Sequence, residues 1–157
     1  MAYTVDNKYS DGYCYEHGSG KLHVMPRGLR NNNPLNIRHS KDKWQGMKEK
    51  QTDKQFVQFK SLAWGFRAGF KTIRTYMTKH GCRNITQIIT RWAPPSENNT
   101  QAYIQKVSQM AMIHPLDLLD YGEESQMIAI VRAMTYVENG VIIAGDSIRE
   151  GYALAQP

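Results

Sequence analysis

One glutamate, at the end of an apolar helical segment, is the residue in this sequence best suited to acid–base chemistry. Residues 127–137 carry apolar side chains at helical spacing, and Glu138 follows them directly before Asn139 and Gly140. Because glycine accepts the left-handed conformation that ends helices, Gly140 predicts that Glu138 lies in the last helical turn. The negative end of the helix dipole and apolar neighbours should favour the protonated form of this carboxyl near neutral pH. A held, protonated carboxyl is what a general acid for glycosidic cleavage requires, and a solvated helix end is the alternative interpretation.

The elements that must position Glu138 are mostly helical. Apolar residues at helical spacing predict helices that follow Ser61, Asn84 and Thr100, in addition to the helix that ends at Glu138. A shorter helix is predicted after Asp146. Residues 44–48 and 54–60 alternate as short strands do, with Asp53 in their connection, which predicts one small β-hairpin between about residues 43 and 60. The fold class expected is therefore α+β, mainly α.

Two segments lack a helical or strand period. Residues 1–25 are rich in Tyr, Gly, Ser and Lys and are interpreted as an N-terminal arm, which leaves residues 26–157 as the domain proper. Three consecutive asparagines, residues 31–33, precede Pro34 and exclude a regular element there, because Asn tolerates left-handed backbone and bonds to its own main chain. Such a polar segment can line a cleft or serve as a structural loop.

Length and charge limit the classes of function. A chain of 157 residues fits one domain, and its net charge of +6 favours a polyanionic partner such as nucleic acid or an anionic cell wall. The Lys and Arg residues are scattered along the chain, which weakens the case for nucleic acid. There is no apolar run of membrane-spanning length and no signal-peptide h-region, so delivery to a cell wall would need another route or association with a virion.

The cysteines suggest no metal or cofactor site. Cys14 and Cys82 lack zinc-ligand spacing, so free thiols are expected. Cys14 could act as a nucleophile beside His17, His23 or His39, but two cysteines among five histidines produce such pairs by chance.

The order of these motifs resembles the lysozyme-like superfamily of peptidoglycan-cleaving enzymes, particularly lytic transglycosylases and phage-type muramidases. In those families a helix ends in a catalytic Glu, an Asn-Pro segment and a hairpin region follow, and a Tyr-Val helix comes later. The similar segments here are Val137–Gly140, Asn33–Pro34 and Tyr103–Val107, within a resemblance that covers roughly residues 27 to 150. The stretch from Arg27 to Arg38, with Trp44–Gly46 and Phe56–Phe59, is also similar to short proteins of bacteriophages and prophages, including endolysins.

One departure from the family pattern has a structural consequence. The helix that carries Glu138 comes late in this chain, whereas those families place it first, so the resemblance implies a circular permutation. The Glu138 helix must then pack beside the loop of residues 31–33. Glu16 precedes the Asn-Pro segment, as an unpermuted fold would demand, but no helical period surrounds it.

The resemblance implies cleavage of the glycan strand between N-acetylmuramic acid and N-acetylglucosamine. Glu138 would protonate the glycosidic oxygen, and a hydrolase would need a second carboxylate, for which Asp53 is the candidate unless it is a plain turn residue. A lytic transglycosylase needs none, because the muramyl 6-hydroxyl attacks within the substrate. The residues expected to bind substrate are Asn32, Asn33, Asn36, Trp44, Tyr103 and Asn139, with Trp92 as a further stacking candidate.

Other interpretations of the same residues remain open. Glu97 is expected to cap the following helix, and Tyr103 and the tryptophans could be core residues. The alternative functions are a non-enzymatic virion or adaptor protein that keeps the fold, and a nucleic-acid-binding domain suggested by charge alone. The leading hypothesis is a monomeric, cofactor-free and metal-free enzyme whose partner is peptidoglycan rather than nucleic acid.

Overall fold

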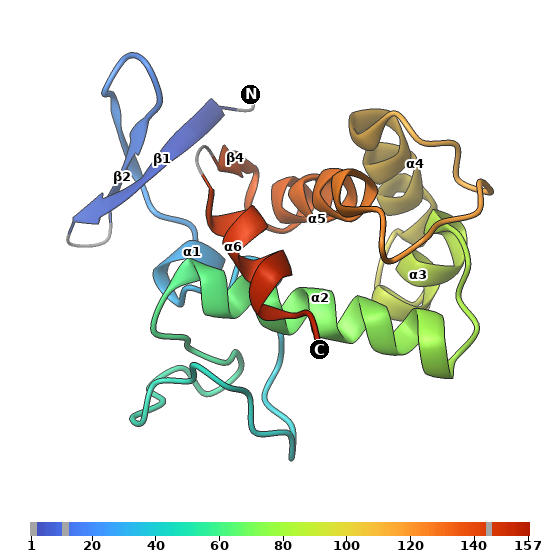
Figure 1. Ribbon diagram of the computed structural model, residues 1–157. Coiled ribbons are helices and arrows are strands. Elements are labelled where there is room, and N and C mark those ends of the chain that lie inside the picture. Colours follow the sequence, from blue (N-terminus) through green and yellow to red (C-terminus); the bar gives the residue numbers. More distant parts are fainter. Residues whose placement is uncertain (1–2, 11–12, 144–145) are drawn as a thin grey trace.

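The computed structural model describes residues 3–10, 13–143 and 146–157 and confirms the mainly helical α+β class. The helices are α1 (Arg27–Arg30), α2 (Leu62–Lys79), α3 (Ile85–Trp92), α4 (Thr100–Ala111), α5 (Glu124–Asn139) and α6 (Ser147–Leu154). The strands are β1 (Tyr3–Ser10), β2 (Tyr13–Glu16), β3 (Leu22–Val24) and β4 (Val141–Ile143). Figure 1 shows the strands at one end of the helices and α3 and α4 at the other. None of the described helices is long and apolar enough to cross a membrane.

Polar caps start the helices close to where the sequence predicts them. Ser61 caps α2 and Asn84 caps α3, each through a side-chain oxygen that accepts the backbone N–H three residues later. The expectation that Glu97 caps α4 is wrong, because Asn99 takes that position and its side chain accepts the corresponding N–H. Gly140 ends α5 with φ at +73°, as its place after Asn139 predicts.

The predicted hairpin between residues 43 and 60 forms only in part. Its two predicted strand segments pair through a single antiparallel bridge, Met47 with Phe59, and Phe56 bridges to Arg38 outside the predicted hairpin. Next to the Met47–Phe59 bridge, a side chain takes over the pairing: Gln51 Nε2 donates to the carbonyl of Gln58 at 2.8 Å, and the Gln58 N–H donates to Gln51 Oε1 at 2.8 Å. Because side-chain bonds of this kind compete with the hydrogen bonds of a strand ladder, the segment forms an irregular loop.

A four-stranded sheet takes three of its strands from residues 1–25, the segment that we expected to be an arm. Its strand order is β3-β2-β1-β4, with β1 antiparallel to β2 and parallel to β4. A four-stranded sheet was not predicted, because no periodic pattern marks residues 1–25 and β4 has only three residues. Val5 and Cys14 are fully buried in the same core as the helices. The β1–β4 pairing therefore joins the start of the chain to the strand that directly follows α5.

The centre of the molecule depends on close backbone approach at a glycine of α2. A Cβ built on Gly65 would lie 2.0 Å from the backbone oxygen of Asn32 and 2.7 Å from Cδ of Pro34. Any side chain at this position would push α2 away from the asparagine-rich loop. Gly65 thus sets the distance between the longest helix and the loop that leads towards Glu138.

This contact makes a specific prediction for Gly65→Ala. In a helix interior alanine is normally better than glycine by about 1 kcal/mol, but overpacking of this kind costs about 1–3 kcal/mol. We expect the variant to be less stable than the wild type in urea unfolding. Thr75→Ala, an exposed change in the same helix, is the control and should be neutral or slightly stabilising. A Gly65→Ala protein that gains stability would show that the loop does not press on α2.

Candidate functional site

The Glu138 carboxylate is held by two hydrogen-bond donors from distant parts of the chain. Asn36 Nδ2 donates to Oε1 at 3.1 Å, and the Tyr103 hydroxyl donates to Oε2 at 2.9 Å. Asn36 follows α1 and Tyr103 lies on α4, so three separate elements meet at one side chain. The predicted packing of the Glu138 helix beside the asparagine-rich loop is confirmed by the bond from Asn139 to the Pro34 carbonyl.

Tyr103 is kept in the state that can donate this bond. Its side chain is buried, and burial together with the neighbouring Glu138 carboxylate raises the pKa of the Tyr103 hydroxyl well above its usual range. The phenol therefore stays protonated at any physiological pH and fixes the direction of the Glu138 carboxylate.

Backbone geometry brings Asn36 to this position. Asn32 and Asn36 both have φ of +53°, the left-handed conformation that asparagine tolerates better than most residues. Asn139 Nδ2 donates to the Pro34 carbonyl at 2.7 Å, which ties the end of α5 to the loop. Asn139, expected to bind substrate, thus holds the two elements together.

Asn32 and Asn33 also hold the loop. The side chain of Asn33 is fully buried and donates to the carbonyls of Ile37 and Val57, each at 2.9 Å. The amide of Asn32 donates to the Phe59 carbonyl at 3.1 Å. Neither residue is among those that line the cavities around Glu138.

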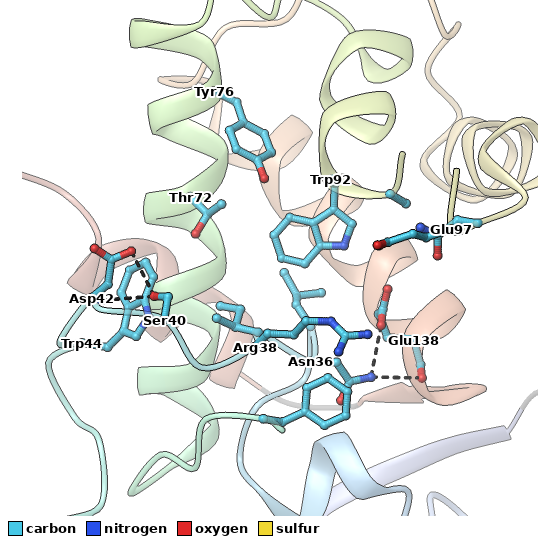
Figure 2. Close-up of a pocket in the computed structure, with 15 residues that line it drawn as sticks. Asn36, Arg38, Ser40, Asp42, Trp44, Thr72, Tyr76, Trp92, Glu97 and Glu138 are labelled. Atoms are coloured by element: carbon cyan, nitrogen blue, oxygen red, sulfur yellow. Dashed lines mark hydrogen bonds between the residues drawn. The ribbon is translucent and has the colours of Figure 1, made fainter. Parts of the chain in front are cut away.

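Glu138 lines two neighbouring cavities. The first, of about 630 Å³, is lined among others by Asn36, Trp44 and Trp92. The second, of about 580 Å³, is lined among others by Tyr103 and Tyr136. Both cavities share Glu138 and Asn98 in their walls. Figure 2 shows Glu138 facing the first cavity, with Arg38, Trp92 and Glu97 around the same opening.

Asp53, the predicted second carboxylate, lies outside both cavities. Arg27 donates to its carboxylate from Nη2 at 2.7 Å and from Nε at 2.8 Å, and Asn31 Nδ2 donates a further bond at 2.9 Å. Its side chain is 9% exposed. The Arg27 guanidinium, helped by the Phe56 N–H, holds the pKa of the Asp53 carboxyl well below its usual range. The structure thus gives Asp53 a place in the framework of residues 51–58.

Sequence reasoning missed three charged residues in the first cavity: Arg38, Asp42 and Glu97. No motif contains Asp42. Arg38 lies at the end of the stretch that resembles bacteriophage proteins but carries no signal of its own, and Glu97 was interpreted as a helix cap. Among the described residues there is also no group of three His, Cys, Asp or Glu side chains that could hold a metal ion.

The two remaining candidates lie away from these cavities. The Cys14 side chain is fully buried, and its thiol sits 3.8 Å from the backbone oxygen of His23, so it is not accessible as a nucleophile. Glu16 bonds to the Ser19 hydroxyl, which lowers the pKa of the Glu16 carboxyl, and it lines neither cavity.

Comparison with known proteins finds a relative in a bacteriophage. The chain is 40% identical over 136 residues to Protein P5 of Pseudoalteromonas phage PM2, a match that covers 84% of this chain and 83% of the relative. The chain belongs to the family of Protein P5. This membership confirms the expected similarity to bacteriophage proteins. No protein-family model matches the chain.

The Asp53 ion pair predicts how stability depends on pH. Because the pKa of Asp53 in the folded protein is below the value of about 3.9 in an unfolded chain, this carboxylate stabilises the fold at neutral pH. That contribution should shrink progressively as the pH falls below about 5. We expect Asp53→Asn to be less stable than the wild type in urea at pH 7, with the difference narrowing towards pH 3. A difference independent of pH would contradict the ionic role. Asp117→Asn, an exposed change, is the control.

Proposed function

We propose that this protein cleaves the glycan strand of peptidoglycan between N-acetylmuramic acid and N-acetylglucosamine, with Glu138 as general acid and base. The observation that carries the proposal is the position of Glu138. Its carboxylate is fixed by Asn36 and Tyr103 and lies in the shared wall of two cavities. A glycan laid along both cavities would bring a glycosidic oxygen to this carboxyl.

The surroundings of Glu138 suit a polysaccharide. The first cavity is open and lined by the indoles of Trp44 and Trp92 together with polar side chains. Aromatic faces can stack on sugar rings, and amide groups such as those of Asn36 and Asn98 can bond to sugar hydroxyls and acetamido groups. The resemblance to lysozyme-like enzymes and the phage origin of the relative support the same assignment.

The position of Asp53 favours one of the two possible reactions. A retaining or inverting hydrolase requires a second carboxylate at the scissile bond, and Asp53 is engaged elsewhere by Arg27. We favour intramolecular transglycosylation, which needs no carboxylate besides Glu138. A hydrolase would have to use Asp42 or Glu97, which line the same cavity. Protonated Glu138 gives its proton to the glycosidic oxygen as the C1–O bond breaks. The resulting carboxylate takes the proton of the muramyl 6-hydroxyl as that oxygen bonds to C1, which leaves a 1,6-anhydro product and consumes no water.

Glu138→Gln tests the proposal. An amide keeps the shape of the side chain but cannot transfer a proton, so cleavage of purified peptidoglycan should fall about 10²–10⁴-fold. Stability should change little, because a carboxylate at a helix C-terminus is unfavourable in any case. Glu49→Gln, an exposed change in a loop, is the matched control and should keep full activity.

The outcomes of this assay separate the candidate functions. A Glu138→Gln protein with wild-type activity would exclude Glu138 as the acid. A wild-type protein that cleaves no peptidoglycan would favour the alternative, a non-enzymatic virion or adaptor protein with the same fold.

Mass spectrometry of the released muropeptides tests the mechanism. We expect 1,6-anhydromuramic products, each lighter than the hydrolysed product by one water. Asp53→Asn, assayed well below its unfolding temperature, should keep activity because its carboxylate does not reach the substrate. Reducing-end products together with loss of activity in Asp53→Asn would instead support a muramidase with two carboxylates.

A further inference from the structure

Two arginines flank one aromatic ring at the edge of the first cavity. The guanidinium carbon of Arg27 lies 4.6 Å from the centroid of the Phe56 ring, and that of Arg38 lies 5.4 Å from it. An antiparallel backbone bridge to Phe56 holds the main chain of Arg38 in place. Both cations are thus held by the same ring, but only Arg38 lines the cavity that contains Glu138.

The two guanidinium groups differ in what they bind. Arg27 is occupied by the Asp53 carboxylate and by Gln55 Oε1 at 3.2 Å. Arg38 is exposed, and within the described part of the chain its guanidinium forms no ion pair. Asp42, Glu97 and Glu138 line the same cavity, yet none of their carboxylates lies within ion-pair distance of the Arg38 guanidinium.

The close-up view places this group beside the proposed reaction centre. Figure 2 shows the side chain of Arg38 extending towards Asn36 and Glu138, with the indole of Trp92 on the other side of the opening. Stacking on Phe56 limits the freedom of the side chain, so less conformational entropy is lost when the guanidinium binds a partner.

We propose that Arg38 binds a carboxylate carried by the glycan next to the bond at Glu138, so that the substrate is the anionic, peptide-bearing polymer and not a neutral polysaccharide. This inference rests on the proposed function. A planar guanidinium with unused donors binds a carboxylate through two parallel hydrogen bonds, a geometry that a neutral sugar hydroxyl cannot provide. In peptidoglycan such carboxylates occur on the stem peptide, and on the lactyl group where the peptide has been removed.

Binding to insoluble peptidoglycan tests this inference without relying on turnover. Co-sedimentation is measured with three preparations of the polymer. All variants carry Glu138→Gln, and the protein with this change alone is called the parent. The first is intact, the second has its carboxylates converted to neutral methylamides, and the third has been stripped of stem peptides so that only lactyl carboxylates remain. Arg38→Gln is compared with Arg132→Gln, an exposed arginine of α5 that lines neither cavity.

We expect Arg38→Gln to weaken binding to intact peptidoglycan about two- to fivefold, the range for an accessible charged pair. Amidation should weaken binding of the parent by a similar factor and leave binding of Arg38→Gln unchanged. Arg132→Gln should behave like the parent. If the Glu138→Gln protein binds the stripped polymer as well as the intact polymer, Arg38 recognises the lactyl carboxylate. If it binds the stripped polymer as weakly as the amidated one, Arg38 recognises the stem peptide.

Two results would overturn the inference. Equal binding of the parent to intact and amidated polymer would show that no carboxylate is recognised. An equal loss for Arg38→Gln on both preparations would show that the arginine acts in another way. Failure of the proposed function is seen separately, as absence of cleavage by the wild-type protein, and it does not alter this binding comparison.

Discussion

The rest of the structure depends on how closely the loop of residues 31–36 is held between two helices. On one side, the missing side chain of Gly65 lets α2 touch the loop backbone. On the other, the amide of Asn139 bonds to the loop and fixes the end of α5 against it. Asn36 and Glu138 lie on either side of the Asn139–Pro34 contact. The packing of the helices on the loop therefore also sets the hydrogen bond between Asn36 and Glu138. Stability and site geometry thus share one set of contacts.

Two arginines near the cavity have different roles: Arg27 forms a structural ion pair with Asp53, whereas Arg38 forms no ion pair among the described residues. Asp53 neutralises Arg27 and accepts two backbone N–H groups, which stabilises a segment that has no strand ladder of its own. The ring of Phe56 then supports Arg38 at the cavity. A carboxylate with so many donors is a poor general base, because each bond favours its ionised form and restricts its movement. This engagement of Asp53 is the physical reason to reject it as the second carboxyl of a hydrolase.

The sequence was sufficient for features that depend on local signals. The caps at Ser61 and Asn84 and the glycine after Asn139 each leave a mark within a few residues, and the helices they bound are present. The meeting of Glu138 with the asparagine-rich loop was predicted through the resemblance, since no local rule brings together residues a hundred positions apart. The sheet, the cavities and the partner of Asp53 could not be predicted, because they depend on pairings between segments without periodic pattern.

Glu138 is proposed to act on a glycan that occupies both cavities. A crystal structure of the Glu138→Gln protein with a peptide-bearing tetrasaccharide of peptidoglycan tests this most directly. We expect sugar rings in both cavities, with the substituted side chain at hydrogen-bond distance from the central glycosidic oxygen. Saccharide bound away from residue 138, or confined to a surface that does not include the shared wall of the two cavities, would contradict it.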